Sequence, residues 1–171
     1  MSIGVDIFPT SPAVPTWGEV KSQFMTLLSN QADLAEQLDL RLLGPDELIR
    51  DDEYFIPESA YYLELSVPNT LGIVMSKGDD IDKNAYLEDY GRNLSTEKIA
   101  DYVTLWSEAA YYFEVTSQAG RSEKEGFLFI ALARALANSC NGYVIVMHSS
   151  AFNLGVGVYS PDQLDNMQAK F

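Results

Sequence analysis

The sequence predicts a single α+β domain over residues 1–171, with a mixed, mostly antiparallel sheet of about five or six strands and helices packed on it. Short segments rich in aromatic and β-branched residues alternate with amphipathic segments of helical period. Two strand-like segments within residues 60–76 are separated only by the turn "PNTLG", which is typical of a β-hairpin. Residues 123–138 are apolar on most faces and predict a central helix.

The N-terminal segment predicts a strand followed by a helix. Ile3, Val5 and Ile7 alternate with small or polar residues, as expected for a first strand. After a proline-rich connection, Thr16 and Glu19 have the spacing of a capping box, and an amphipathic helix follows to about residue 30. The next stretch, "ADLAEQLDLRLL", fits either a second helix or a switch from helix to strand.

The middle of the chain predicts the hairpin, an acidic loop and a further helix. The loop covers 77–93 and includes a short helix around Tyr86–Tyr90. Ser95 is in a position to cap the helix that follows it. That helix has an apolar stripe at helical spacing, made by Ile99, Tyr102, Val103 and Trp106.

The last third predicts a strand over 110–116, the central helix and two more strands, "YVIVMH" and "GVGVY". Four alanines of the central helix allow other elements to approach it closely; they are Ala131, Ala133, Ala135 and Ala137. Gly142 is expected to end this helix. A final helix is expected to begin at Ser160 and Pro161.

The charge balance is strongly acidic. Eleven basic residues stand against 25 acidic residues, which gives a formal net charge of −14. Such a field repels nucleic acids and anionic membranes and attracts basic partners, although it also serves solubility alone. No apolar run is long enough to span a bilayer, and the N-terminal residues lack the features of a secretory signal. A cytoplasmic protein is therefore expected, with no nucleic-acid or membrane partner.

Motifs for catalysis or metal binding are missing from the sequence. Cys140 and His148 are the only cysteine and histidine, which is too few for a structural zinc site. An EF-hand loop that starts at Asp80 would place Ala85 where the turn needs glycine and Gly91 where a bidentate Glu is needed. We therefore predict a non-enzymatic protein with no cofactor and no metal, and Cys140 is expected to be a small buried residue.

The loop "TSQAGRS", which enters the central helix, fits neither phosphate-binding pattern. Ser122 and Glu125 have the spacing of a capping box, and the acidic residues of the first turn already occupy the positive end of the helix. The loop therefore predicts a helix start rather than an anion site. Arg121 is the one residue of the loop left without a structural role, and we expect it to contact a partner.

The acidic residues concentrate in two segments, "GPDELIRDDEYFIPE" and "GDDIDKNAYLEDYG". Each holds at least five acids and a single basic residue, and tyrosines that look exposed lie within them, together with Phe55. We expect these segments to form a docking face for a protein. The expected contact residues are Asp51, Asp52, Glu53, Tyr54, Asp79, Asp80, Asp82, Tyr86 and Arg121.

The last third of the chain, "YYFEVTSQAGRSEKEGFLFIALARALANSCNGYVIV" followed by "YSPDQL", resembles small bacterial proteins of toxin–immunity and secretion-system neighbourhoods. The shared pattern is a strand that ends in a Gly-Arg loop, an Ala/Leu-rich helix, a strand started by glycine and a helix started by Tyr-Ser-Pro. The resemblance implies a small, acidic, cytoplasmic immunity protein.

The first hypothesis is thus an immunity protein that neutralises a cognate basic toxin or effector by occluding its active site through an acidic face. One alternative is an acidic secretion chaperone for an effector protein, which would present an apolar groove and form a homodimer. Two others are an enzyme that uses carboxylates and an acidic α+β domain of unrelated binding function, whose charge serves solubility.

Overall fold

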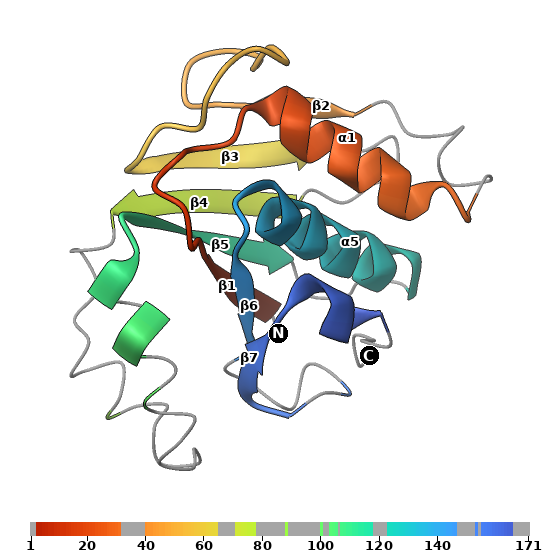
Figure 1. The fold of residues 1–171 in the computed structure, drawn as a ribbon. Coiled ribbons are helices and arrows are strands. Elements are labelled where there is room, and N and C mark those ends of the chain that lie inside the picture. The colour runs from red at the N-terminus through yellow and green to blue at the C-terminus, as the bar shows by residue number, and fades with distance from the viewer. Residues whose placement is uncertain are drawn as a thin grey trace.

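A computed structural model describes residues 3–31, 40–64, 71–77, 88, 100, 103–105, 107–117, 123–146, 153 and 155–165. It confirms the α+β class, because a layer of helices packs on an antiparallel sheet (Figure 1). The elements are β1 (Ile3–Phe8), α1 (Trp17–Leu28), β2 (Arg41–Leu43), β3 (Ser59–Glu64), β4 (Leu71–Lys77), β5 (Tyr111–Ser117), α5 (Glu123–Ser139), β6 (Tyr143–Val146), β7 (Gly157–Tyr159) and the 3₁₀ helix η3 (Pro161–Leu164).

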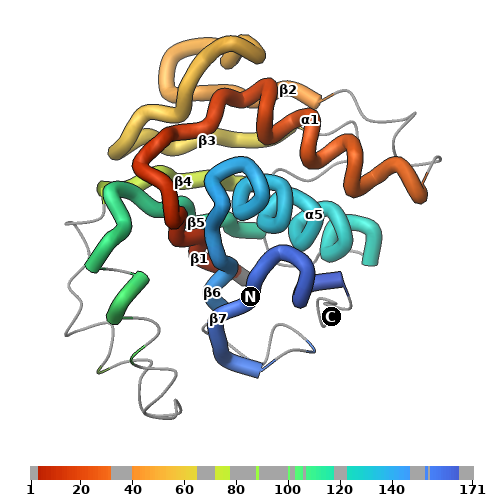
Figure 2. Tube along the Cα trace, viewed as in Figure 1, coloured from red at the N-terminus to blue at the C-terminus, as the bar shows by residue number. Residues whose placement is uncertain are grey.

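The sheet has seven strands in the order β2-β3-β4-β5-β1-β6-β7. The first strand of the chain therefore lies inside the sheet, between two strands from the last third of the sequence. Val5 faces Val115 on β5, and Phe8 faces Tyr143 on β6, both in antiparallel register. The chain crosses from β5 to β6 through α5, which Figure 2 shows as the teal-to-blue helical segment in front of the sheet.

The sheet has one strand more than the upper value of the expected five or six, and the additional strand is β2. Its segment fits both a helix and a strand by periodicity, because it is short and rich in leucine. In the structure Arg41–Leu43 pairs with β3, and Leu42 faces Leu63 in that ladder. Leu42 is fully buried, so cross-strand pairing and burial, rather than local propensity, determine the strand.

Helices α1 and α5 lie side by side on one face of the sheet (Figure 1). As expected, α1 buries its apolar stripe, which consists of Trp17, Val20, Phe24 and Leu28. The central helix is confirmed as α5, which packs against α1 and against the inner strands of the sheet. Its alanines at 131, 133, 135 and 137 are all buried, in keeping with close packing on several sides.

The expected helix starts and hairpin are confirmed wherever the structure describes them. Thr16 and Glu19 form a capping box: the Thr16 hydroxyl accepts from the Glu19 amide at 3.2 Å, and a Glu19 carboxylate oxygen accepts from the Thr16 amide at 2.7 Å. β3 and β4 form the hairpin, with Tyr61 facing Ile73. The final helix is a single 3₁₀ turn within the described residues.

The predicted cap of the central helix and the predicted apolar stripe of the preceding helix involve residues that the structure does not describe. Ser122 and the stripe residues Ile99, Tyr102 and Trp106 are among those not described. Val103 is described, lies in a helical segment and is 39% exposed.

Helix α5 ends in a Schellman turn that leads directly into β6. The Gly142 amide donates to the Ala137 carbonyl at 2.7 Å, and Asn141 has a φ of 49°, the left-handed conformation that this turn requires. A Cβ on Gly142 would lie 2.6 Å from the Phe8 carbonyl oxygen and 2.9 Å from the Cys140 sulfur. The turn therefore fits against the end of β1 only because residue 142 has no side chain.

We predict that Gly142→Ala lowers the free energy of unfolding by about 1–3 kcal/mol, because the added methyl group must displace the backbone of β1. Gly155→Ala is the matched control, since a Cβ on Gly155 would meet no atom within 4 Å. The control is expected to change stability by less than about 1 kcal/mol. Urea unfolding followed by circular dichroism measures both, and equal effects would contradict the role of close approach.

Candidate functional site

The candidate site is the acidic loop, defined as Gly44–Glu58, which connects β2 and β3. It contains six acidic residues and one basic residue, Arg50. Four of the expected contact residues belong to it: Asp51, Asp52, Glu53 and Tyr54. In Figure 1 the loop arches over the start of α1.

The backbone of the acidic loop supplies acceptors to the first turn of α1. The Trp17 amide donates to the Glu53 carbonyl at 2.9 Å, and the Gly18 amide donates to the Asp51 carbonyl at 2.8 Å. These amides are among the four at a helix start that have no partner within the helix. The acidic side chains also lie near the positive end of the helix dipole, so part of the acidity of the loop has a structural explanation.

Phe55 fixes the centre of the loop to the core. It is only 3% exposed, and its ring meets those of Tyr61 and Phe113 edge-on at centroid distances of 5.0 and 5.2 Å. The expectation that Phe55 is exposed is therefore wrong. Ile56 is fixed next to it, because its amide donates to the Tyr61 hydroxyl at 2.7 Å.

Both ends of the loop are also bonded to the sheet. Near its start, the Ile49 amide donates to the Leu42 carbonyl at 2.8 Å, which folds the loop back against β2. At its end, Glu58 has a φ of 66°, and its amide donates to the Met75 carbonyl at 2.8 Å. The loop is thus held at its two ends, at Phe55 and at the start of α1.

Three large apolar side chains point out of this fixed loop. Leu48 is 51% exposed, Tyr54 is 64% exposed and Ile56 is 63% exposed. Tyr54 was expected from the sequence, whereas Leu48 and Ile56 were missed. Their occurrence inside an acidic, proline-bounded segment could have indicated exposure, because a loop with so many charges cannot bury all its apolar residues.

Arg50 offsets part of the negative charge. Its Nε lies 2.8 Å from a Glu53 carboxylate oxygen and 3.4 Å from one of Asp52. The hydrogen bond with Glu53, followed by the charge of Asp52, raises the pKa of Arg50. Asp51 pairs with Lys21 on α1 at 3.3 Å.

Asp46 and Glu47, in contrast, are exposed and form no ion pair with any residue that the structure describes. The acidic loop therefore keeps a net negative surface after its internal pairs are counted, and this surface is what an approaching partner would meet.

The other expected contact residues lie outside the described residues, so the structure does not show whether they join the acidic loop. They are Asp79, Asp80, Asp82, Tyr86 and Arg121.

Cys140 is described and its expected burial is confirmed, at 2% exposure beside the end of α5. Burial raises the pKa of its thiol to about 12, although two backbone hydrogen bonds act in the opposite direction. Its thiolate is thus scarce at neutral pH, and His148, the partner considered in the sequence, lies outside the described residues.

In the described part of the chain, no group of three or more His, Cys, Asp or Glu side chains is arranged to hold a metal ion. No helix in that part combines the length and apolar character needed to cross a membrane. The chain matches no protein-family model, no curated protein and no solved structure, so the resemblance to immunity proteins stays a prediction.

We predict that Phe55→Ala lowers the free energy of unfolding by about 3–5 kcal/mol, because it removes a buried ring and the anchor of the acidic loop. Tyr54→Ala, the neighbouring and exposed aromatic, is the control and is expected to stay within about 0.5 kcal/mol of the parent. Urea unfolding measures both. A mild Phe55→Ala effect would show that the loop is not anchored through this ring.

We also predict a loss of stability at alkaline pH that depends on Cys140. Its pKa is raised in the folded state to about 12, so the folded protein holds the thiol proton more tightly than the unfolded chain does. The resulting stabilisation is complete below the unfolded thiol pKa, about 8.5–9, and is lost as the pH rises towards the folded value. The slope reaches about 1.4 kcal/mol per pH unit.

Urea unfolding between pH 8 and pH 11 measures this slope. Cys140→Ala should reduce it, while the pKa of Tyr111, raised by burial and then by the charge of Cys140, maintains a remaining slope. An unchanged slope in Cys140→Ala would contradict the assignment.

Proposed function

We propose that this protein is a non-enzymatic binding protein whose acidic loop docks on a basic face of another protein and inhibits it by occlusion. The partner in this proposal is a basic toxin or effector, and the protein acts as its immunity protein. The observation that carries the proposal is the acidic loop itself: exposed acids and exposed apolar side chains presented on one rigidly held segment.

The charges support fast and selective encounter with a basic protein. The chain has a net charge of −14, and the acidic loop adds a local excess of five negative charges. Fields of this kind raise association rates with oppositely charged partners and repel those of like charge. They also determine which surface of the protein the partner meets first.

The exposed apolar side chains support binding after encounter. Protein interfaces obtain most of their free energy from a few central, well-packed residues, often aromatic, with charges at the rim. Tyr54 and Ile56 have this character and lie beside Asp51, Asp52 and Glu53. The pattern therefore fits an anchor of apolar residues surrounded by acids.

The fixed backbone supports affinity. A mobile loop loses conformational entropy when it binds, whereas a loop held in advance does not. The hydrogen bonds from Trp17, Gly18 and Ile56 and the burial of Phe55 hold this loop before any partner arrives.

The partner can be captured with a photo-crosslinking amino acid at position 54. We expect one basic protein to be crosslinked in cells from Tyr54 and not from Glu114, an exposed acidic position on β5 that lies outside both acidic segments. Capture of an acidic protein, capture from both positions, or capture of a second copy of this chain would overturn the proposal.

The captured protein is then tested against two matched variants. We predict that Asp51→Asn with Asp52→Asn slows association at least about threefold at low salt and much less above about 0.5 M salt. Glu108→Gln with Glu114→Gln removes the same charge from exposed positions outside both acidic segments and is expected to have little effect. Stopped-flow or surface-binding kinetics measure the rates, and equal slowing by both pairs would contradict docking through the acidic loop.

The inhibitory role has its own readout. One equivalent of the protein should abolish the activity of the captured partner, and Tyr54→Ala should restore activity by raising the dissociation rate about fivefold or more. Full partner activity in a saturated complex would overturn inhibition while leaving the docking result intact.

A further inference from the structure

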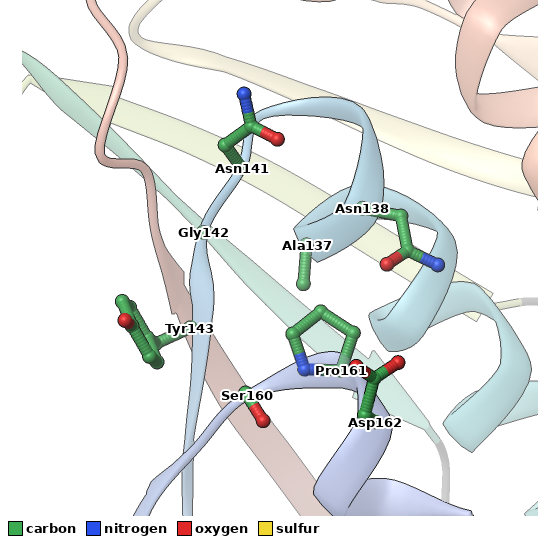
Figure 3. Close-up of a pocket in the computed structure, with 8 residues that line it drawn as sticks. All are labelled: Ala137, Asn138, Asn141, Gly142, Tyr143, Ser160, Pro161 and Asp162. Carbon is green, nitrogen blue, oxygen red and sulfur yellow. The ribbon is translucent and has the colours of Figure 1, made fainter.

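A second feature lies where α5 ends. A hollow of about 240 Å³ opens between the last turn of α5, the start of β6 and η3 (Figure 3). Its volume is below the range of roughly 300–1,000 Å³ that holds drug-sized ligands, so it fits a single side chain or a small ion. The hollow is lined by Ala137, Asn138, Asn141, Gly142, Tyr143, Ser160, Pro161 and Asp162.

The electrostatics of this hollow favour a cation. The carboxyl end of a helix carries a partial negative charge, and α5 has no basic residue in its last turn to offset it. Asp162 adds a full negative charge, and none of the lining residues that the structure describes is Lys or Arg. The described lining of the hollow is therefore negative and holds no cation.

Hydrogen-bond acceptors in the hollow are also available. The side chains of Asn138, Asn141 and Asp162 form no hydrogen bond or ion pair with any residue that the structure describes. In Figure 3 the Asp162 carboxylate and the Asn138 amide lie at the right of the hollow, and the Asn141 amide lies at the upper left. These oxygens can accept from a donor that has several N–H groups pointing in different directions.

The remaining lining suits the apolar stem of such a donor. Ala137 and Pro161 lie at the centre of the view in Figure 3 and offer apolar contact, and Tyr143 is 36% exposed at the opposite side. Long basic side chains bury their methylene groups on apolar surface while their charged heads find polar partners.

We propose that this hollow, called here the α5-end pocket, binds one basic side chain of another protein, with arginine preferred over lysine. A guanidinium group offers five donors in a planar fork, which matches several separate acceptors better than the compact ammonium group does. An anionic ligand would be repelled by the negative helix end and by Asp162. A purely apolar ligand would remove water from these polar groups without offering them a hydrogen bond.

The α5-end pocket lies close enough to the acidic loop to share its partner, a step that rests on the proposed function. The Thr10 hydroxyl donates to the Asn141 carbonyl at 2.5 Å, and Thr16 pairs with Tyr54 in an isolated bridge. Thr10 and Thr16 are six positions apart in the chain, so the two sites are joined by at most about 22 Å of extended chain. A standard interface covers about 800 Å² on each partner and can include both.

The ligand of the pocket is tested without any partner. The isotope-labelled protein is titrated with N-acetyl-arginine-N-methylamide and, as the uncharged isostere, with N-acetyl-citrulline-N-methylamide, and amide shifts are followed by NMR. We expect saturable shifts at residues 138–143 and at Asp162, with a Kd on the order of 1 mM for the arginine compound. The citrulline compound should bind about tenfold more weakly, and the lysine analogue should fall between them.

Matched variants localise the site. Asp162→Asn should weaken binding of the arginine compound about threefold, whereas Asp46→Asn, an exposed acid of the acidic loop, should leave the Kd unchanged. Equal binding of the citrulline compound, equal effects of both variants, or shifts confined to the acidic loop would overturn the pocket assignment. Tighter binding of free arginine than of the blocked compound would identify a free metabolite rather than a side chain as the ligand.

This experiment separates the two proposals. If the arginine compound does not bind, the proposed role of the α5-end pocket is refuted. Docking through the acidic loop is then still decided by crosslinking from position 54. If the crosslinking fails, the claim that both sites bind one partner is refuted. The affinity of the pocket for the arginine compound, which is measured without a partner, is unaffected.

Discussion

The burial of α5 against the sheet and beside α1 (Figure 1) is the constraint on which the rest of the structure depends. This helix contacts β1, β5, β6, α1 and η3, and its small residues make these approaches possible. Because α5 runs antiparallel to α1 in Figure 1, the start of α1 and the end of α5 lie at the same end of the helical layer. The two helices thus bring a positive terminus and a negative terminus to neighbouring positions.

The start of α1 and the end of α5 differ in the groups that satisfy their backbone hydrogen bonds and charges. The start of α1 is covered by carbonyl groups and acidic side chains of the acidic loop, so its positive end is neutralised from within the chain. The end of α5 closes on itself in a Schellman turn and receives no basic side chain in its last turn. Both arrangements increase the negative character of the same end of the molecule.

Much of the fold was predictable, because local rules and burial agree over most of its elements. The capping box of Thr16 and Glu19, the alternation in β1 and the apolar helix at 123–138 all depend on residues within a few positions of each other. β2 was ambiguous because three residues give no reliable period and its strand pairing is with β3, far away in the chain. The position of β1 between β5 and β6 depends on long-range pairing and could not be read from local sequence.

The negative charge of the candidate site was predictable from the sequence, whereas the burial or exposure of its individual side chains was only partly predictable. The acids at 51–53 and the exposed Tyr54 follow from a polar segment bounded by proline. The burial of Phe55 does not, because two adjacent aromatic residues are locally equivalent and only Tyr61 and Phe113 distinguish them. The α5-end pocket had no sequence pattern, since Asn138 and Asp162 meet only through the packing of η3 on α5.

The place of β1 in the sheet has a consequence for synthesis on the ribosome. Both strands that pair with β1 are made more than a hundred residues after it, since Ile7 pairs with Phe113 and Phe8 with Tyr143. At roughly 5–20 residues per second, β1 waits on the order of ten seconds with its amide and carbonyl groups unpaired. The strand edges of β1 can therefore pair wrongly until the last third of the chain emerges. The strongly acidic composition lowers this risk between neighbouring nascent chains, because chains of like charge repel each other.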